Sequence, residues 1–293
     1  MKLLSRSRRA VARLPIRPRR MNFRFQGFEQ NRYWFDNDPV LTHFMNVLSV
    51  TFPDGERFFV DAVRAFRDQV DDPQRQKDIS GFIGQEAMHS LEHQAFNDLV
   101  AGHGEGYDAL VGEALGVAQR LLAGARKHLG AERQLAATAG LEHITAILAD
   151  TILRRADMVE KMDPSVRPLW VWHAIEETEH KAVAFDLYQD VSGDYWQRQR
   201  AFFYGTAYLT VFSAYFTWRF LKEDGVHRRP LTLAKGLWKM FGYSFGHKGV
   251  VTQAIPAWFQ YLRPGFHPWQ DDNSHLLEQW RDPLPEPAVT AAA

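Results

Sequence analysis

The pattern Glu-x-x-His occurs twice in this chain, at Glu86-Ala87-Met88-His89 and at Glu177-Thr178-Glu179-His180. Both copies lie among good helix formers, and positions i and i+3 of a helix share one face. Each copy therefore points one carboxylate and one imidazole at the same place. Two such helices can hold two metal ions when each of two further helices adds a Glu. The repeat predicts an all-α fold around a metal centre, with solvated acids and hydrogen-bonded histidines as the simpler alternative.

Glu56 and Glu142 are the best placed candidates for the two further glutamates. Glu56 follows Thr-Phe-Pro-Asp-Gly (51–55), which is typical of a helix start because Pro and acidic residues favour the first turn. Glu142 lies in the middle of an Ala- and Leu-rich segment. The order along the chain then allows one helical hairpin in each half. The predicted ligands are Glu56, Glu86, His89, Glu142, Glu177 and His180.

Three neighbouring side chains stay open between several roles. His173, four residues before Glu177, is expected as a third imidazole ligand or as a packed side chain. His93, four residues after His89, is expected to support the ligands through a hydrogen bond or proton transfer, or to pack. Glu176 is the alternative ligand to Glu177 because it also pairs with His173 and His180 at helical spacing. Glu179 is expected to point away.

Helical periodicity dominates the rest of the first 195 residues, and no sustained period-2 alternation accompanies it. The pattern predicts helices over about 51–70, 74–99, 108–128, 131–162 and 164–191. Short connections between them imply antiparallel neighbours and a helix bundle. Gly-Tyr-Ser-Phe-Gly (242–246) matches a serine nucleophile elbow, but no strand precedes it, so we expect no serine nucleophile there.

Composition restricts the metal chemistry and the location. The chain has no cysteine, so any metal must be held by His, Asp or Glu.

Residues 1–20 contain eight basic groups and no acid, which leaves 27 basic against 35 acidic groups in the rest. We expect a flexible arm there, with a transit peptide or an arm on anionic lipid or nucleic acid as alternatives. Of these possible partners we predict a membrane surface, and we expect no binding to nucleic acid. No apolar secretory signal follows, so we expect a cytoplasmic protein, or a membrane-associated one.

Residues 201–218 carry no charge and include eight aromatic side chains. An uncharged run of this length is at the lower edge of what spans a bilayer. It is expected as a buried bundle helix, a membrane-associated or partly inserted helix, or a homodimer interface. Residues 196–280 are expected to form an aromatic helical extension that packs on the bundle or associates with a membrane, and residues 281–293 a disordered tail.

Several runs resemble a known family. They are Thr-Phe-Pro-Asp-Gly-Glu-Arg-Phe-Phe (51–59), Phe-Ile-Gly-Gln-Glu-Ala-Met-His-Ser-Leu-Glu-His (82–93), Leu-Glu-His-Ile-Thr-Ala (141–146), Trp-His-Ala-Ile-Glu-Glu-Thr-Glu-His-Lys (172–181) and Arg-Pro-Gly-Phe-His-Pro-Trp (263–269). They look like the bacterial "predicted metal-dependent hydrolase" family, a ferritin-like group, over roughly residues 15–280. This implies a ferritin-like four-helix bundle over residues 21–195, with extra helices and an aromatic C-terminal extension, and a carboxylate-bridged metal pair on the six predicted ligands. The His-x-x-x-Glu-x-x-His element also resembles that of di-iron arylamine N-oxygenases, where an extra histidine, here His173, ligates one iron.

The donor set indicates which metals and reactions to expect. Carboxylates with imidazoles suit iron or manganese better than magnesium, and no thiolate favours zinc. We expect two metal ions, iron first, with manganese or a mixed manganese–iron pair as alternatives. We predict an oxidoreductase, a dioxygen-dependent oxidase or oxygenase, acting on a hydrophobic small molecule or lipid. The alternatives are a metal-dependent hydrolase that uses metal-activated water, in line with the label of the resembled family, and a non-catalytic metal-binding protein.

Overall fold

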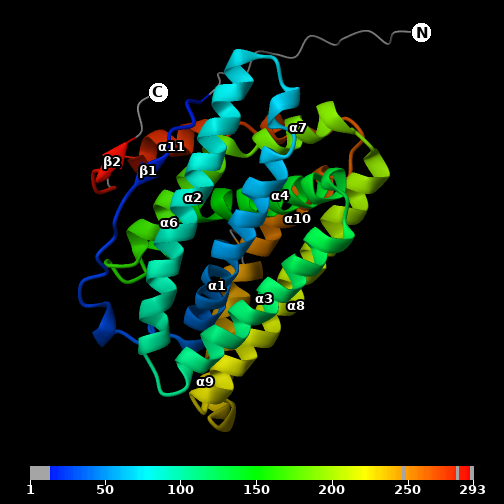
Figure 1. The fold of residues 1–293 in the computed structure, drawn as a ribbon. Helices are drawn as coiled ribbons and strands as arrows, with labels where there is room; N and C mark the ends of the chain where they lie inside the picture. Colours follow the sequence, from blue (N-terminus) through cyan, green and yellow to red (C-terminus); the bar gives the residue numbers. More distant parts are fainter. Residues whose placement is uncertain (1–13, 246–248, 282–283, 291–293) are drawn as a thin grey trace.

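The computed structural model describes residues 14–245, 249–281 and 284–290. Its helices are α1 (Pro39–Arg64), α2 (Pro73–Gly102), α3 (Tyr107–His128), α4 (Ala131–Arg154), α5 (Ala156–Val159), α6 (Arg167–His180), α7 (Val183–Val191), α8 (Tyr195–Glu223), α9 (Pro230–Phe245), α10 (Val250–Gln260) and α11 (Ser274–Arg281). Two strands of two residues each, β1 (Arg19–Arg20) and β2 (Val289–Thr290), pair antiparallel. The predicted all-α class is confirmed for the described residues (Figure 1).

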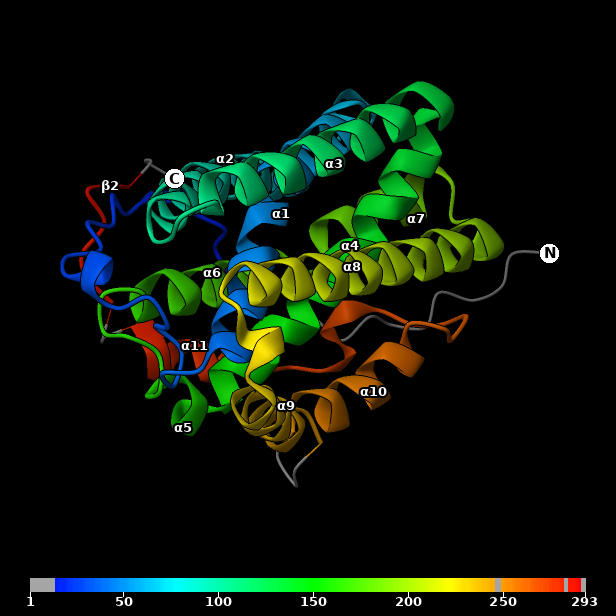
Figure 2. The ribbon, with the colours of Figure 1, turned by 90° about the horizontal axis from the view of Figure 1, so that it is seen from below.

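Helix α1 is the centre of the arrangement and contacts α2, α3, α4, α8 and α9. Helix α4 contacts α6, α7 and α8, and α2 contacts α6. Seen from below, α2 and α3 form one outer layer, α9 and α10 lie on the opposite side, and α4, α6 and α8 lie between them (Figure 2). Helices from both halves of the chain therefore meet around α1, where the predicted ligands lie.

Helix α1 begins at Pro39, well before the predicted start near Thr51. The side chain of Asp38 caps it by accepting hydrogen bonds from the backbone N–H groups of Val40 and Leu41. Pro53, which suggested a helix start, lies inside the helix and cannot donate to the carbonyl of Ser49, four residues earlier. Asn97 Nδ2 of α2 donates to that carbonyl instead, at 3.1 Å. The prediction was wrong here because a side chain from another helix replaces the missing hydrogen bond.

Two other predicted helices are divided in the structure. The helix predicted over 131–162 ends at Arg154, because Arg155 leaves the helical conformation (φ −114°, ψ 63°), and the short α5 follows. The helix predicted over 164–191 begins at Arg167 and is interrupted after His180, where Lys181 and Ala182 separate α6 from α7. The buried ammonium of Lys181 donates to the Asp271 carbonyl at 2.7 Å and to Asn273 Oδ1 at 2.8 Å. This break thus ties α6 to the segment before α11.

The aromatic run 201–218 lies within α8, and its residues are divided between the interior and the surface. Phe202, Phe212 and Phe216 are buried, whereas Tyr204 and Val211 are exposed. Among the described residues, no helix combines the length and the apolar character that a membrane span requires.

The first and last described segments of the chain contact the helices. Residues 1–13, with five of the basic groups of the predicted arm, and residues 282–283 and 291–293 of the predicted tail, lie outside the described residues. Three backbone N–H groups, those of Met21, Asn22 and Phe23, donate to the buried carboxylate of Glu92 on α2. Strand β1 pairs with β2, so these two segments, far apart in the sequence, lie side by side (Figure 1).

The first described residues cross α2 at two glycines. A Cβ at Gly81 would lie 2.4 Å from the Ile16 carbonyl oxygen, and one at Gly84 would lie 2.3 Å from Pro18 Cγ. Glycine is needed at these positions because the crossing chain lies directly on the helix backbone.

We expect Gly81→Ala to lower the free energy of unfolding by about 1–3 kcal/mol, because the added methyl group pushes the crossing segment off α2. Gly112→Ala on α3 is the matched control, since a Cβ there meets nothing within 4 Å. This control should gain up to about 1 kcal/mol from its helix propensity. Urea unfolding followed by circular dichroism measures both, and equal stabilisation of the two variants would contradict the close crossing.

Candidate metal centre

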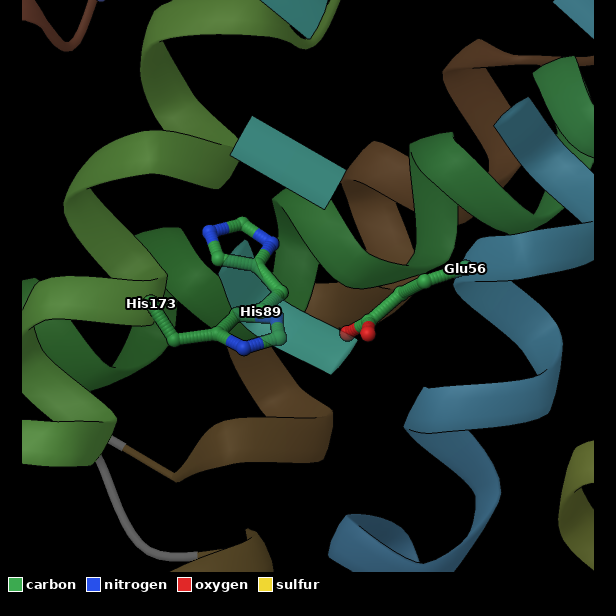
Figure 3. A group of neighbouring side chains, drawn as sticks. All are labelled: Glu56, His89 and His173. Atoms are coloured by element: carbon green, nitrogen blue, oxygen red, sulfur yellow. The ribbon is translucent and has the colours of Figure 1, made fainter. Parts of the chain in front are cut away.

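Seven predicted donor residues lie together in the interior, on four helices. They are Glu56 on α1, Glu86 and His89 on α2, Glu142 on α4, and His173, Glu177 and His180 on α6. Each is at most 5% exposed. Figure 3 shows Glu56, His89 and His173 pointing towards one another from three different helices.

The donor atoms form overlapping groups that could each hold a cation. Within each group the donor atoms lie within 4.8 Å of one another. The groups are Glu56, His89 and His173; Glu86, Glu142 and His180; and Glu86, His89 and Glu177. Because Glu86 belongs to two groups and His89 to two, the donors form one continuous cluster.

His180 and His173 both approach Glu177. His180 Nε2 lies 3.1 Å from Glu86 Oε1, 3.4 Å from Glu142 Oε2 and 3.6 Å from Glu177 Oε1. His173 Nε2 lies 3.2 Å from the same Glu177 oxygen. Thr145 of α4 donates its hydroxyl proton to the other oxygen, Oε2, of Glu177. That hydrogen bond leaves Glu177 Oε1 facing the two imidazoles.

Many of these buried donor atoms have no hydrogen-bond partner. They include both carboxylate oxygens of Glu86 and of Glu142, Oε1 of Glu56, both ring nitrogens of His89, and Nε2 of His180. Buried polar atoms in folded proteins are nearly always hydrogen-bonded, so a concentration of unpaired ones in one place needs an explanation. Carboxylate oxygens and imidazole nitrogens are metal ligands, and bound cations would give many of these atoms a partner. The residues present therefore fit a metal centre.

The electrostatics of the cluster favour a cation as well. Burial, reinforced by the neighbouring Glu86, raises the pKa of Glu56 and of Glu142 well above the usual range. Burial would lower the pKa of His180, but Glu177 and the other carboxylates outweigh it and raise that pKa. Burial likewise would raise the pKa of Glu177, but His180 and His173 hold it well below its usual value. The cluster thus attracts positive charge, which protons supply when no metal ion does.

A hydrogen-bonded chain from Glu179 sets the orientation of His180. Gln85 Nε2 donates to Glu179 Oε2 at 2.7 Å, which leaves Gln85 Oε1 to accept from His180 Nδ1 at 2.8 Å. His180 Nδ1 is therefore protonated in the neutral ring, and the lone pair of Nε2 faces the carboxylates. Glu179 belongs to none of the three donor groups, but it is buried rather than solvent-exposed and holds Gln85 in place.

A second chain, which begins at the carbonyl freed by Pro53, sets the orientation of His173. Asn97 donates Nδ2–H to the Ser49 carbonyl, so Asn97 Oδ1 accepts from Ser49 Oγ at 2.7 Å. Ser49 Oγ has then used its only proton and must accept from His93 Nδ1 at 2.8 Å. His93 Nε2 in turn accepts from His173 Nδ1 at 2.8 Å. The lone pair of His173 Nε2 is left facing Glu177, as a metal ligand requires.

Glu176 supports His89 and lies outside the three donor groups. Its Oε2 lies 3.2 Å from His89 Nε2, and its Oε1 accepts hydrogen bonds from Trp172 Nε1 at 2.9 Å and from Arg19 at 2.8 Å. Burial raises the pKa of Glu176 well above its usual value, and the charge of Arg19 opposes that shift. The other ring nitrogen of His89, Nδ1, lies 3.6 Å from Glu177 Oε1 and 3.8 Å from Glu86 Oε1.

Two arginines, one on β1 and one on α11, neutralise the carboxylates of Glu176 and Glu179. Arg19 donates to Glu176 and, at 2.7 Å, to Glu179, and Arg281 of α11 donates to Glu179 at 2.7 Å. Sequence reasoning did not identify Arg19, Gln85, Ser49 or Asn97 as part of the site. These residues belong to no sequence motif, and only the packing of distant segments brings their side chains to the candidate ligands.

We expect Glu142→Gln to reduce bound metal markedly, because it removes one ligand charge with almost no change in shape. Glu132→Gln is the matched control, since Glu132 lies on the same helix and is exposed. Atomic spectrometry after dialysis measures metal content. Retention of the full content by Glu142→Gln would contradict the assigned cluster.

We expect Asn97→Leu to weaken metal binding by about 10–100-fold, because the proton order of the Ser49–His93–His173 chain is lost. The measurements are the metal dissociation constant and the histidine ¹⁵N spectrum of the metal-free protein, which reports the His173 tautomer. Gln94→Leu is the control, because the half-buried Gln94 lies on the same helix and donates to Asp98 rather than to the chain. Unchanged affinity and an unchanged tautomer in Asn97→Leu would rule out the chain.

Comparison with known proteins corrects the expected chemistry. A family model described as "Predicted metal-dependent hydrolase" matches residues 17–272. The prediction of an oxidoreductase was therefore wrong, because the matched family is described as hydrolytic, and the resemblance to arylamine N-oxygenases found no support. Searches of curated proteins and of solved structures found no match. Since the family model covers most of the chain, the protein belongs to the predicted metal-dependent hydrolase family.

Proposed function

We propose that this protein hydrolyses a hydrophobic ester or amide with a pair of divalent metal ions. The observation that carries the proposal is an apolar cavity of about 360 Å³ whose wall includes His173 and Glu177, two of the candidate ligands. A substrate in this cavity would have its reactive group beside the metal centre. The family membership supports hydrolysis as the reaction.

We further propose that α1, α2, α4 and α6 form a ferritin-like bundle around two ions. One ion would be held by Glu86, Glu142 and His180, and the other by Glu56, His89 and His173, with Glu177 between them. The three donor groups and the contacts of α1 with α2 and of α4 with α6 support this assignment. Mixed carboxylate and imidazole ligands without thiolate suit Fe(II) or Mn(II).

The cavity supports an apolar substrate. Its walls come from α1, α4, α5, α6, α9 and α10, and most of the lining side chains are aliphatic or aromatic, such as Leu48, Phe52, Ile152 and Met240. Such a cavity binds apolar groups through the hydrophobic effect and gives a reactive group little access to bulk water.

A metal pair supplies an activated water and polarises the carbonyl group of the substrate. The side chains of the protein orient the residues that would hold this metal pair. Thr145 and His180 keep the Glu177 carboxylate at the cavity wall, and the Ser49–His93–His173 chain keeps a lone pair on His173 Nε2. Ser90 Oγ donates to Glu56 Oε2 at 2.9 Å, which leaves Glu56 Oε1 free toward the cluster.

We expect the manganese-loaded protein to hydrolyse p-nitrophenyl esters, with kcat/KM rising from acetate to octanoate. Each methylene buried in the cavity contributes about 0.8 kcal/mol, so the increase should be several-fold per added carbon until the cavity is filled. Ala254→Leu narrows the cavity and should lower kcat/KM for octanoate more than for acetate.

Two comparisons decide the outcome of this experiment. Thr252→Leu, at an exposed position of the same helix, should leave the chain-length profile unchanged. Glu142→Gln should abolish turnover of every ester. Absence of turnover by the fully loaded protein on esters and amides of all lengths would refute the hydrolase proposal and favour a non-catalytic metal-binding protein.

A further inference from the structure

Exposed apolar side chains gather on three consecutive helices. Of the sixteen large hydrophobic residues that are exposed among the described residues, thirteen lie on α8, α9 and α10. Leu231 is 86% exposed and Trp238 is 74% exposed, both on α9. Monomeric proteins in water rarely expose so many large apolar side chains together, and such patches mark interaction surfaces.

Helix α9 is apolar on the side that faces away from the protein. Its inner side packs on α1, where a Cβ at Gly236 would lie 2.5 Å from Val40 Cγ2. On the outer side the rings of Trp238 and Phe241 stack with their centroids 5.9 Å apart, and the ring centroids of Phe241 and Phe245 are 5.0 Å apart. A surface helix of a water-soluble domain normally has a polar outer side. The aromatic outer side of α9 is typical of helices that lie in a membrane interface.

The charge of this region selects an anionic partner. Residues 225–270 contain six Lys and Arg residues and no Asp or Glu. Arg228 and Arg229, at the start of α9, and Lys235 on it are exposed. A second copy of this chain would bring the same basic side chains opposite each other, which opposes self-association through this face. Anionic lipid headgroups attract it.

An apolar groove connects this face with the interior. It has a volume of about 540 Å³ and lies between α8 and α9, with Trp218 and Leu237 among its lining residues. Phe44, Leu48, Leu148 and Met240 line both the groove and the cavity beside the candidate metal ligands. An apolar molecule that enters between α8 and α9 is therefore separated from that cavity only by side chains that both spaces share.

We propose that the outer face of α8, α9 and α10 docks on an anionic lipid surface and admits an apolar substrate through the groove. The docking goes beyond the proposed function and does not depend on it, while the admission of substrate rests on the hydrolase proposal. Figure 2 shows α9 and α10 on the side of the molecule opposite α2 and α3, with α8 next to α9.

Vesicle sedimentation with the full chain tests the docking without any turnover. The wild type should sediment with vesicles of phosphatidylcholine and phosphatidylglycerol, and much less with phosphatidylcholine alone. The double variant Leu231→Gln/Trp238→Gln should bind about ten-fold more weakly, since two apolar anchors are lost. Arg228→Glu/Arg229→Glu should weaken binding to a similar degree and reduce its dependence on salt.

Leu121→Gln is the matched control, because Leu121 on α3 is 52% exposed and lies outside the proposed face. It should bind like the wild type, and circular dichroism should show all variants folded. Equal binding by the wild type and the Leu231→Gln/Trp238→Gln variant would overturn the proposal and assign lipid binding to another segment, such as residues 1–20. A wild-type dimer that this variant dissociates, with no vesicle binding, would overturn it in favour of self-association.

Discussion

Four glutamates and three histidines meet in the interior of this protein, and their burial is the constraint on which the rest of the structure depends. Carboxylates withdrawn from water are strongly destabilising unless they are paired or bound to a metal ion. Glu176 and Glu179, at the edge of the cluster, are paired with Arg19 and Arg281. The inner oxygens of Glu86 and Glu142 have no such partner. The distribution of arginine thus separates supporting carboxylates from the candidate ligands.

Distant parts of the chain are folded back to orient these ligands. The residues before α1 cross α2 at glycines and bring Arg19 to α6, and α11 brings Arg281 to the same carboxylate. Pro53 leaves the Ser49 carbonyl without its helical donor, and the bond from Asn97 to this carbonyl orders the protons from Asn97 to His173. Two local irregularities therefore affect the orientation of the candidate ligands. They are the proline within α1 and the segment that crosses α2 at two glycines.

The two sides of the candidate centre differ in chemistry. The polar supports are Gln85 on α2, Glu179 on α6, and the arginines of β1 and α11. On the other side α1, α4, α5, α6, α9 and α10 line an apolar cavity. This division would let one side fix the ligands while the other accommodates an apolar substrate. The outward apolar face of α8 to α10 continues the apolar side to the surface.

The sequence by itself determined the all-α class and identified the donor residues that the structure brings together. It could do so because Glu-x-x-His is a local pattern, and in a helix its two side chains point to the same side. Tertiary structure alone decided where α1 begins, since Asn97 of another helix supplies the hydrogen bond that Pro53 removes inside α1. It also decided that Glu179 faces inward and that Arg19 neutralises it, because both depend on contacts between residues far apart in the chain. Ligand types could not decide the reaction, since carboxylates and imidazoles serve oxidation and hydrolysis alike. The apolar cavity, built from six separate helices, has no counterpart in any single stretch of sequence.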